Sequence, residues 1–239
     1  MRFLLCQLMA ALSITTLLNA CAKPVLEVAL DSTLTILESD RNYSYDQMRE
    51  KWVVIGDIKG NAPRLHIENK EYFLAIAPNR APFAALRPIK AQLLATPFLS
   101  WTWRIAQDTQ PNSTLQLAIG LRDEKITNDA WNLSRFWSNS LPPFSRSLII
   151  EWGRSAHQTG SLWVSKKDRQ GRSRARYVAR GGLENQGLWW REHIDLSSLH
   201  STAWPGLDMR YTQIVFVGFI LNKHDSTLAS HLKKISLSR

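Results

Sequence analysis

Residues 99–105 read LSWTWRI, and apolar and polar side chains alternate through all seven positions. A period of two places successive side chains on opposite faces of a β-strand, so this stretch predicts a strand with one face in a core. The apolar face carries two tryptophans and is expected to pack inside the protein. Its members are Leu99, Trp101, Trp103 and Ile105.

The same period continues outward from this strand along the chain. Residues 115–121, 148–152 and 162–164 alternate in the same way, and residues 211–221 form a nearly continuous apolar run. A run of that kind is typical of a central strand that is buried on both faces. Further strands are expected near residues 33–37, 52–57, 64–68, 72–77 and 235–237.

Helical patterns are few. Residues 196–203 fit a short helix that Asp195 caps and Pro205-Gly206 ends, and residues 44–51 fit one or two further turns. Many short alternating strands separated by polar turns favour an all-β protein. We therefore expect an antiparallel β-sandwich of jelly-roll type with one or two short helices.

The composition is that of a basic globular protein. The chain has 239 residues, of which 30 are Lys or Arg and 20 are Asp or Glu, so its net charge is +10, and 44% of the residues are hydrophobic. These values exclude a disordered chain and a protein with many membrane spans. The length suits one domain, or at most two small ones. Two cysteines are too few for a disulfide-rich fold or a cysteine-rich zinc site.

The first 20 residues are typical of a secretory signal peptide. Arg2 supplies the positive charge, and residues 3–18 form an apolar segment that is too short and too polar to span a membrane. The segment ends in Leu18-Asn19-Ala20-Cys21, which resembles the cleavage motif of bacterial lipoproteins. That resemblance implies that Cys21 is acylated and anchors the protein to a membrane. With Ala22 as the next residue, it implies the periplasmic face of the outer membrane.

The alternative is an ordinary signal peptide that is cut near Ala20 or Ala22, with an incidental Cys21. In a lipoprotein, Cys6 leaves with the signal and Cys21 carries lipid, so thiol catalysis and cysteine-bound metals are excluded for the folded body. The expected organisation is a signal peptide over 1–20, a tether with an early strand over 21–45, and one β-sandwich domain over 46–239.

Residues 98–238 resemble a bacterial family known as domain of unknown function 3047. The resemblance rests on the LSWTWRI strand, on Glu151-Trp152-Gly153, on Trp190-Arg191-Glu192 and on the apolar strand at 214–221. It implies a secreted, β-rich protein that is similar to carbohydrate-binding sandwiches, and it implies no established activity.

The chain departs from this family at two turns. The turn after the long apolar strand is acidic in the family, whereas residues 222–227 here contain Lys223, which would oppose any cation that relatives bind there. Pro111-Asn112-Ser113 also replaces an acidic approach to the strand that follows the tryptophan-rich one.

A basic segment is the sharpest charge feature. Seven Lys or Arg residues and one Asp fall between residues 166 and 180, and Gln170-Gly171 marks the tip of a hairpin. Such a patch attracts phosphates and carboxylates, so we predict an anionic envelope glycan or lipid headgroup as partner and no nucleic acid. The alternative is a solvated hairpin that keeps the domain soluble. The candidate ligand-binding residues of this segment are Arg172, Arg174 and Arg176.

The tryptophans divide into core and surface candidates. Trp163 alternates out of phase with its apolar neighbours, and Trp131 and Trp137 lie in the long irregular stretch at 122–146. These three are candidate platforms, because an exposed aromatic ring can stack on a sugar. The alternative for the long stretch is a lid that folds back over the sandwich. Trp101, Trp103 and Trp152 are assigned to the core.

Catalytic signatures are absent from the sequence. Glu151 and Glu192 are the candidates for a glycoside-cleaving carboxylate pair, which needs two carboxyls about 5–9 Å apart. The commoner explanation of such glutamates is an ion pair with an arginine. The six histidines show no metal-ligand spacing, so we expect no metal and no cofactor.

The leading hypothesis is an envelope-anchored lipoprotein whose non-catalytic β-sandwich binds a glycan or another cell-envelope component. One alternative is a polysaccharide-modifying hydrolase or lyase that uses Glu151 or Glu192. The other is a structural lipoprotein that recruits a protein partner through the tryptophan-containing stretch.

Overall fold

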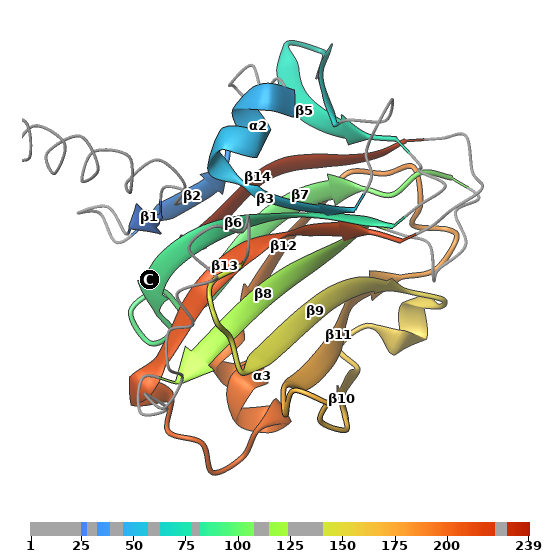
Figure 1. Ribbon diagram of the computed structural model, residues 1–239. Coiled ribbons are helices and arrows are strands. Elements are labelled where there is room, and N and C mark those ends of the chain that lie inside the picture. Colours follow the sequence, from blue (N-terminus) through green and yellow to red (C-terminus); the bar gives the residue numbers. More distant parts are fainter. Residues whose placement is uncertain are drawn as a thin grey trace, which may run out of the picture.

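The computed structural model describes residues 25–27, 33–38, 45–56, 63–77, 82–107, 115–123, 141–222 and 229–239. In this part of the chain most of the regular structure is β-strand, arranged in two sheets that pack face to face (Figure 1). The expected all-β sandwich is therefore confirmed. Its helices are α2 (Tyr45–Lys51), α3 (Leu196–Ala203) and the short 3-10 turns η3 (Ala156–Gln158) and η4 (Met209–Tyr211).

The larger sheet has eight strands and the smaller sheet has six. In spatial order, the larger sheet contains β1 (Leu26–Glu27), β6 (Phe83–Gln92), β13 (Thr212–Leu221), β8 (Leu115–Asp123), β9 (Arg146–Gly153), β11 (Ser173–Gly181) and β10 (Leu162–Ser165), with β3 (Val53–Gly56) also paired to β6. The smaller sheet contains β12 (Trp190–Asp195), β7 (Phe98–Arg104), β14 (Ser230–Ser238), β5 (Glu71–Ile76) and β4 (Arg64–Glu68), with β2 (Leu34–Leu37) also paired to β14.

The chain passes repeatedly from one sheet to the other, which is the jelly-roll arrangement expected from the sequence. Strand β6 lies in the larger sheet, β7 in the smaller and β8 in the larger again, and β12, β13 and β14 alternate in the same way. Among the described strands, pairing is antiparallel except between β1 and β6 and between β9 and β11, which are parallel. The parallel pair β9–β11 places the basic segment beside β9.

Three tryptophans hold the two sheets together. Trp101, Trp103 and Trp152 are each at most 2% exposed, as expected. The ring of Trp103, from the smaller sheet, lies edge-on to that of Trp152, from the larger sheet, at 5.6 Å between centroids. Trp101 makes a similar contact with Trp103 at 5.5 Å. Aromatic pairs of this geometry add to the free energy of burial, so this contact stabilises the packing of one sheet on the other.

The apolar run near the end of the chain forms β13, which lies between β6 and β8 and is buried along its length, as predicted. Gly218 permits this close packing, since a Cβ atom there would lie 2.1 Å from the backbone oxygen of Ala85 on β6.

Strand β6 itself is not predicted by alternation, because it is buried at most positions and contains Pro88. A proline has no N–H to donate to a neighbouring strand. The structure accommodates it at a register shift, since Pro88 lies opposite Phe216 and β13 is irregular between Ile214 and Phe216.

Two N-terminal strands belong to the sandwich. The early strand expected near residues 33–37 is β2, which pairs with β14, and β1 pairs with β6. The sandwich therefore includes segments that precede residue 46.

The predicted helix at 196–203 is α3, and the carboxylate of Asp195 accepts hydrogen bonds from the backbone N–H groups of Ser197 and Ser198. Within the described residues, no helix has the length and hydropathy that a membrane crossing requires.

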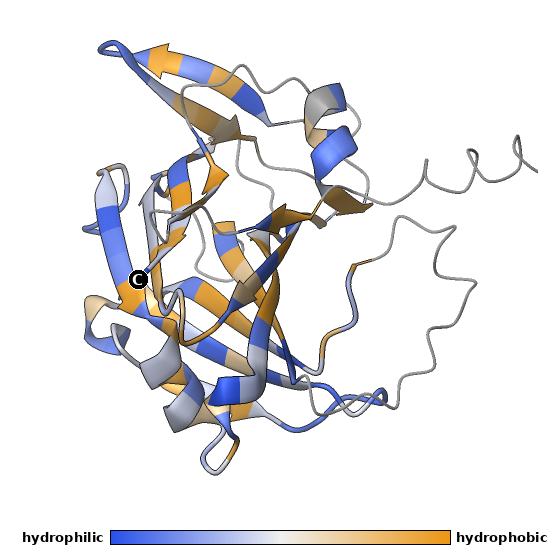
Figure 2. Cartoon of the chain, turned by 90° about the vertical axis from the view of Figure 1, so that its left-hand side faces the viewer, coloured by the Kyte–Doolittle hydropathy of each residue, from blue (hydrophilic) through white to orange (hydrophobic). Residues whose placement is uncertain are grey.

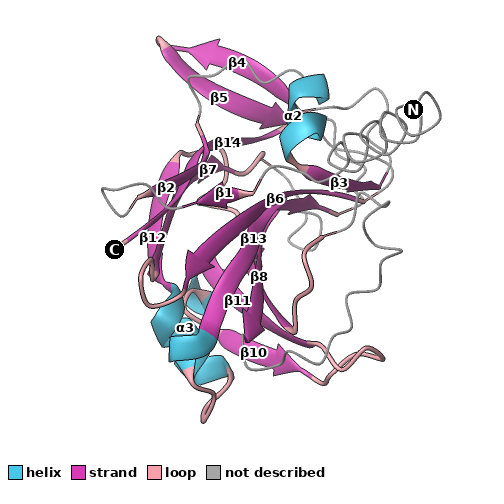
Figure 3. Ribbon diagram, turned by 60° about the vertical axis from the view of Figure 1, so that its left-hand side comes forward, coloured by secondary structure: helices cyan, strands magenta, loops and turns pink. Residues whose placement is uncertain are grey.

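Figure 2 shows apolar and polar bands alternating along many of the strands, as the sequence period predicts. The β4–β5 hairpin lies at one end of the molecule, and α3 and β10 lie at the other (Figure 3).

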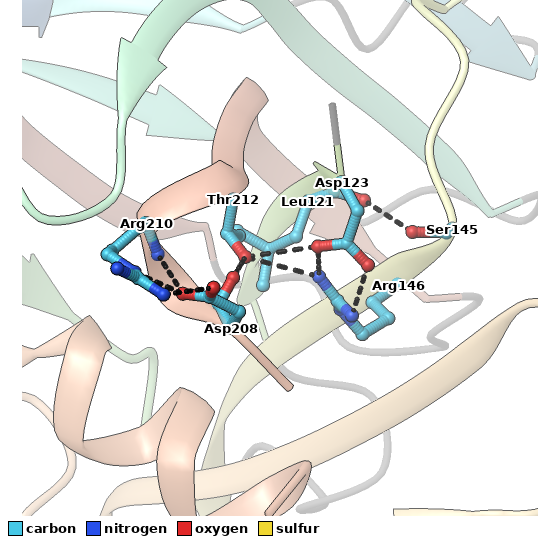
Figure 4. A network of polar contacts seen from close by, with 7 residues as sticks. All are labelled: Leu121, Asp123, Ser145, Arg146, Asp208, Arg210 and Thr212. Carbon is cyan, nitrogen blue, oxygen red and sulfur yellow. Dashed lines mark hydrogen bonds and ion pairs between the residues drawn. The ribbon is translucent and has the colours of Figure 1, made fainter. Parts of the chain in front are cut away.

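A buried ion pair lies near the α3 end. Arg146 donates from Nη1 and Nη2 to the two carboxylate oxygens of Asp123, and the Thr212 hydroxyl donates to the same carboxylate at 3.1 Å (Figure 4). This network joins three neighbouring strands of the larger sheet.

Candidate functional site

The outer face of the larger sheet, which points away from the smaller sheet, gathers four functional side chains on four adjacent strands. On β9, Ile150 and Trp152 point into the core, so Glu151 between them points outward. Gln116 of β8 lies on one side of it and Arg176 of β11 on the other. Trp163 of β10 is the direct cross-strand neighbour of Arg176. We call this set the Glu151 site; its members are Gln116, Glu151, Arg176 and Trp163.

One oxygen of the Glu151 carboxylate holds this arrangement. Oε2 accepts hydrogen bonds from Nε of Arg176 at 3.0 Å, from Nη2 of Arg176 at 2.6 Å and from Nε2 of Gln116 at 3.2 Å. The Glu151 side chain is only 7% exposed, so its charge is stabilised by these charge-assisted bonds and not by bulk water. Among the described residues, none donates to the other oxygen, Oε1.

Trp163 supplies an exposed ring beside these polar groups. It is 43% exposed, as predicted from its phase in the strand, and it lies on an edge strand of the sheet. Its cross-strand position next to Arg176 brings a flat apolar surface and a fixed charged group to the same face.

An apolar cluster closes the neighbouring part of the outer face. Phe216 of β13 occupies the space above Gly120 of β8, and Phe144 packs edge-on against Phe216 at 5.1 Å. The segment that contains Phe144 therefore covers the face next to β13, and the Glu151 site lies beyond it toward β10. The cluster consists of Leu86, Ala118, Ile149, Val215 and Phe216, with Ala84, Leu141, Phe144 and Ile220 against it.

The basic segment forms the predicted hairpin between β10 and β11, and we call residues 162–181 the basic hairpin. Its turn is held by Asp168, whose carboxylate accepts from the backbone N–H groups of Gln170 and Arg172, both at 2.9 Å, and from Nε of Arg172 at 2.8 Å. Gly171 adopts a φ of +74°, which favours glycine. The Arg172 guanidinium also lies 4.9 Å from the centre of the Phe144 ring.

Glu192 lies elsewhere, between the two sheets. It is directly opposite Trp101 on β7, and its Oε1 accepts from Nε1 of the buried Trp103 at 3.3 Å. Arg180 of β11 donates to the same oxygen at 2.6 Å and stacks over the ring of Trp190 at 3.7 Å. Glu151 points out of the larger sheet while Glu192 points into the sandwich, so the fold does not bring these carboxylates together as a pair.

Burial and the Glu192 charge raise the pKa of Tyr177, which packs against the core. The hydroxyl therefore stays protonated at pH 7, and the ion pair of Arg180 with Glu192 joins β11 to β12.

The outer face of the smaller sheet carries a second aromatic and charged cluster. Arg104 and Lys233 both lie against the ring of Trp189, at 4.7 and 4.1 Å from its centre. Nε of Arg104 donates to Nδ1 of His231 at 2.9 Å. Burial, followed by the Arg104 charge, lowers the pKa of His231 to about 4, so its ring is neutral at pH 7. Both cations already contact the indole ring, and Phe73 of β5 packs against Trp189 and His231. We therefore interpret this cluster as packing that holds the β4–β5 hairpin in place.

Several predicted site residues fall outside the described part of the chain. These are Cys21, Trp131 and Trp137, together with residues 223–227 of the turn after β13. Over the residues that are described, no group of three or more His, Cys, Asp or Glu side chains could hold a metal ion.

Sequence reasoning singled out Glu151, Trp163 and Arg176 separately, and the fold brings them together. It missed Gln116, whose signal is its place on the polar face of an alternating strand. That signal becomes informative only once β8 is known to pair with β9.

The chain matches no family model and no curated protein. Among solved structures it is similar to a family 12 glycoside hydrolase, at 6% identity and a TM-score of 0.45 over 92% of this chain and 98% of the other. It is also similar to the family 12 endoglucanase 3 of Trichoderma harzianum, at 10% identity and a TM-score of 0.42 over 91% and 94% of the two chains.

A third similarity is to the family 11 carbohydrate-binding module of a cellulosomal cellulase of Clostridium thermocellum. The identity is 8% and the TM-score is 0.42, and the match covers 88% of this chain and 96% of the module.

Proposed function

We propose that this protein is a non-catalytic glycan-binding module of the bacterial cell envelope and that it binds its glycan at the Glu151 site. The observation that carries the proposal is the juxtaposition of an exposed ring, Trp163, with a buried carboxylate whose Oε1 accepts no hydrogen bond from the described residues. The sandwich supplies the rigid scaffold on which these side chains are held.

The chemistry of the site suits a sugar. The apolar C–H face of a pyranose stacks on an aromatic ring, and its hydroxyls need fixed acceptors and donors for orientation. Oε1 of Glu151 is such an acceptor, and the Gln116 amide and the Arg176 guanidinium hold that carboxylate in place. Few side-chain adjustments are then needed on binding, which limits the entropic cost.

Binding is favoured over hydrolysis by the placement of the two candidate glutamates. Cleavage of a glycosidic bond uses an acid and a second carboxylate on either side of that bond, about 5–9.5 Å apart. Glu151 lies on the outer face and Glu192 in the interior, where Arg180 and Trp103 occupy it. A pair made of these two groups would have no common space for a substrate.

The test is a binding screen of the purified protein on an array of bacterial envelope polysaccharides, with Trp163→Ala and Glu151→Gln as variants. We expect both variants to lose at least tenfold in affinity while their circular dichroism spectra stay unchanged. Tyr72→Ala is the matched control, because Tyr72 is an aromatic residue that is 38% exposed on the distant β4–β5 hairpin. Retained binding in Trp163→Ala, or equal loss in Tyr72→Ala, would overturn the assignment of the site.

Membrane attachment through acylated Cys21, at the periplasmic face of the outer membrane, is part of the same proposal and rests on the Leu18–Cys21 motif. Metabolic labelling with a palmitate analogue should label the native protein and leave Cys21→Ser unlabelled and released from the membrane fraction. An anionic partner, either an envelope glycan or a lipid headgroup, is proposed from the basic hairpin.

A further inference from the structure

We infer that the ligand of the Glu151 site is an acidic polysaccharide and that Arg174 is the residue that recognises its charge. The inference rests on the proposed glycan-binding function and adds the chemical class of the glycan. The inference depends on which cations of the basic hairpin form ion pairs with acidic side chains in the described part of the chain and which do not.

Three of the hairpin arginines have acidic partners. Arg172 pairs with Asp168 in the turn, Arg176 with Glu151 on the outer face and Arg180 with Glu192 in the interior, with N–O distances of 2.8, 2.6 and 2.6 Å. The charge of each of these arginines is therefore balanced by a carboxylate of the protein itself. The remaining four cations are exposed and have no acidic partner among the described residues: Lys166, Lys167, Arg169 and Arg174.

Of the cations without an acidic partner in the described part of the chain, Arg174 is the one that belongs to the site. It is two residues from Arg176 on the same face of β11, about 7 Å away at about 3.4 Å per residue. Its neighbours in register are Ser165 on β10 and Ser147 on β9, so no carboxylate lies beside it in either strand. A ligand that stacks on Trp163 and extends along the hairpin meets the Arg174 guanidinium next.

The other three cations continue this direction toward the turn. Lys166 and Lys167 follow β10 directly, and Arg169 lies within the turn. A row of exposed cations that begins beside an aromatic ring fits a chain of sugars with repeated carboxylate, phosphate or sulfate groups. A single small anion would use only one of these positions.

The hairpin is a poor match for a lipid surface. Its tip, Asp168 to Gly171, is polar, and the exposed apolar side chains of the hairpin, Trp163 and Val164, lie on β10 and not at that tip. The acceptor on Glu151 also suits a ligand that carries hydroxyl groups beside its charged groups, as an acidic polysaccharide does. We therefore commit to the polysaccharide.

The experiment uses the full chain carrying Cys21→Ser, with binding measured to alginate, polygalacturonate and hyaluronate. Each polymer is compared with its carboxyl-reduced form, which keeps the sugar chain and removes the charge. We expect the reduced polymers to bind at least tenfold more weakly, and the affinity for the acidic polymers to fall as salt is raised. Arg174→Ala should lower the affinity for an acidic polymer about tenfold.

Arg191→Ala is the matched control, because Arg191 is exposed on β12 of the smaller sheet and its loss removes the same charge from another surface. Equal binding of acidic and reduced polymers, or equal effects of the two arginine variants, would overturn the inference while leaving glycan binding intact. Binding only to phosphatidylglycerol vesicles, with no polymer bound, would overturn both this inference and the proposed function.

Discussion

Arg176 donates two hydrogen bonds to a single oxygen of Glu151, from Nε at 3.0 Å and from Nη2 at 2.6 Å. The arginine side chain is 41% exposed whereas the Glu151 side chain is 7% exposed, so a partly exposed cation pairs with a buried anion. The interaction therefore stabilises the fold and also orients the acceptor that we assign to the ligand.

We predict that Arg176→Ala lowers the free energy of unfolding by about 1–2 kcal/mol, because it leaves the Glu151 charge buried with only Gln116 as a donor. In a Glu151→Gln background the same change should cost about 1 kcal/mol less, because no charge remains to be stranded. Urea denaturation of the four proteins measures this coupling. Arg174→Ala is the control on the same strand, and a cost equal to that of Arg176→Ala would refute the role of the pair.

Acid should destabilise the protein through His200. The ring is 1% exposed, and neither of its nitrogens has a hydrogen-bond partner among the described residues. Burial, followed by the Arg146 charge, lowers its pKa from 6.5 to about 4. Asp123 opposes this shift but does not reverse it. Between pH 6.5 and 4 the unfolded chain binds a proton at this position and the folded chain does not, so stability is present above pH 6.5 and is lost as the pH falls.

His200→Phe should remove this part of the pH dependence. We expect the variant to lose about 2 kcal/mol less stability than the native protein between pH 7.5 and pH 4.5, and to be at least as stable at pH 7.5. His231, whose pKa is also lowered, stays in both proteins and serves as the reference. Parallel stability–pH curves for the two proteins would contradict the assignment to His200.

The contact of Gly120 with Phe216 should be intolerant of any added side chain. A Cβ atom at residue 120 would lie 2.1 Å from the Phe216 ring, so Gly120→Ala is expected to cost about 1–3 kcal/mol. Adding Phe216→Ala should relieve the clash, and the double variant should cost less than the sum of the two single changes. Thermal melting of the three variants measures this, and strict additivity would show that the ring does not occupy that space.

The turn of the basic hairpin should depend on Asp168. Asp168→Ala removes the acceptor for the backbone N–H groups of Gln170 and Arg172, and we expect faster amide hydrogen exchange at both. Exchange in β13 should not change, since the turn lies outside the core. Glu184→Ala, a change at another exposed carboxylate, is the control. Unchanged exchange at Gln170 would show that the turn is held by its backbone alone.

Much of the fold follows from local sequence signals. Alternation predicted the LSWTWRI strand and the core positions of Trp101, Trp103 and Trp152, and a continuous apolar run predicted the buried course of β13, because both patterns are local properties of the chain. The cap of Asp195 on α3 and the turn at Gln170-Gly171 are local as well. Strand β6 was not predicted, because it is buried on both faces and contains Pro88, so its sequence shows no alternation.

The candidate site could be predicted only in pieces. Trp163 was assigned to the surface and Glu151 to the polar side of its strand from phase alone. Their relation depends on β11 pairing in parallel with β9 and antiparallel with β10, and no local period encodes which strands become neighbours.

The sequence by itself determined which side chains face the core, where the strands turn and how strongly the middle of the chain is charged, because these depend on near neighbours in the chain. Only the tertiary structure decided that Glu151 meets Arg176 on the outer face while Glu192 points inward to Arg180, and that Arg174, unlike Arg172 and Arg176, has no acidic partner among the described residues. Ion pairs and faces depend on strands that meet from distant parts of the sequence, and that pairing is settled by the packing of the whole sandwich.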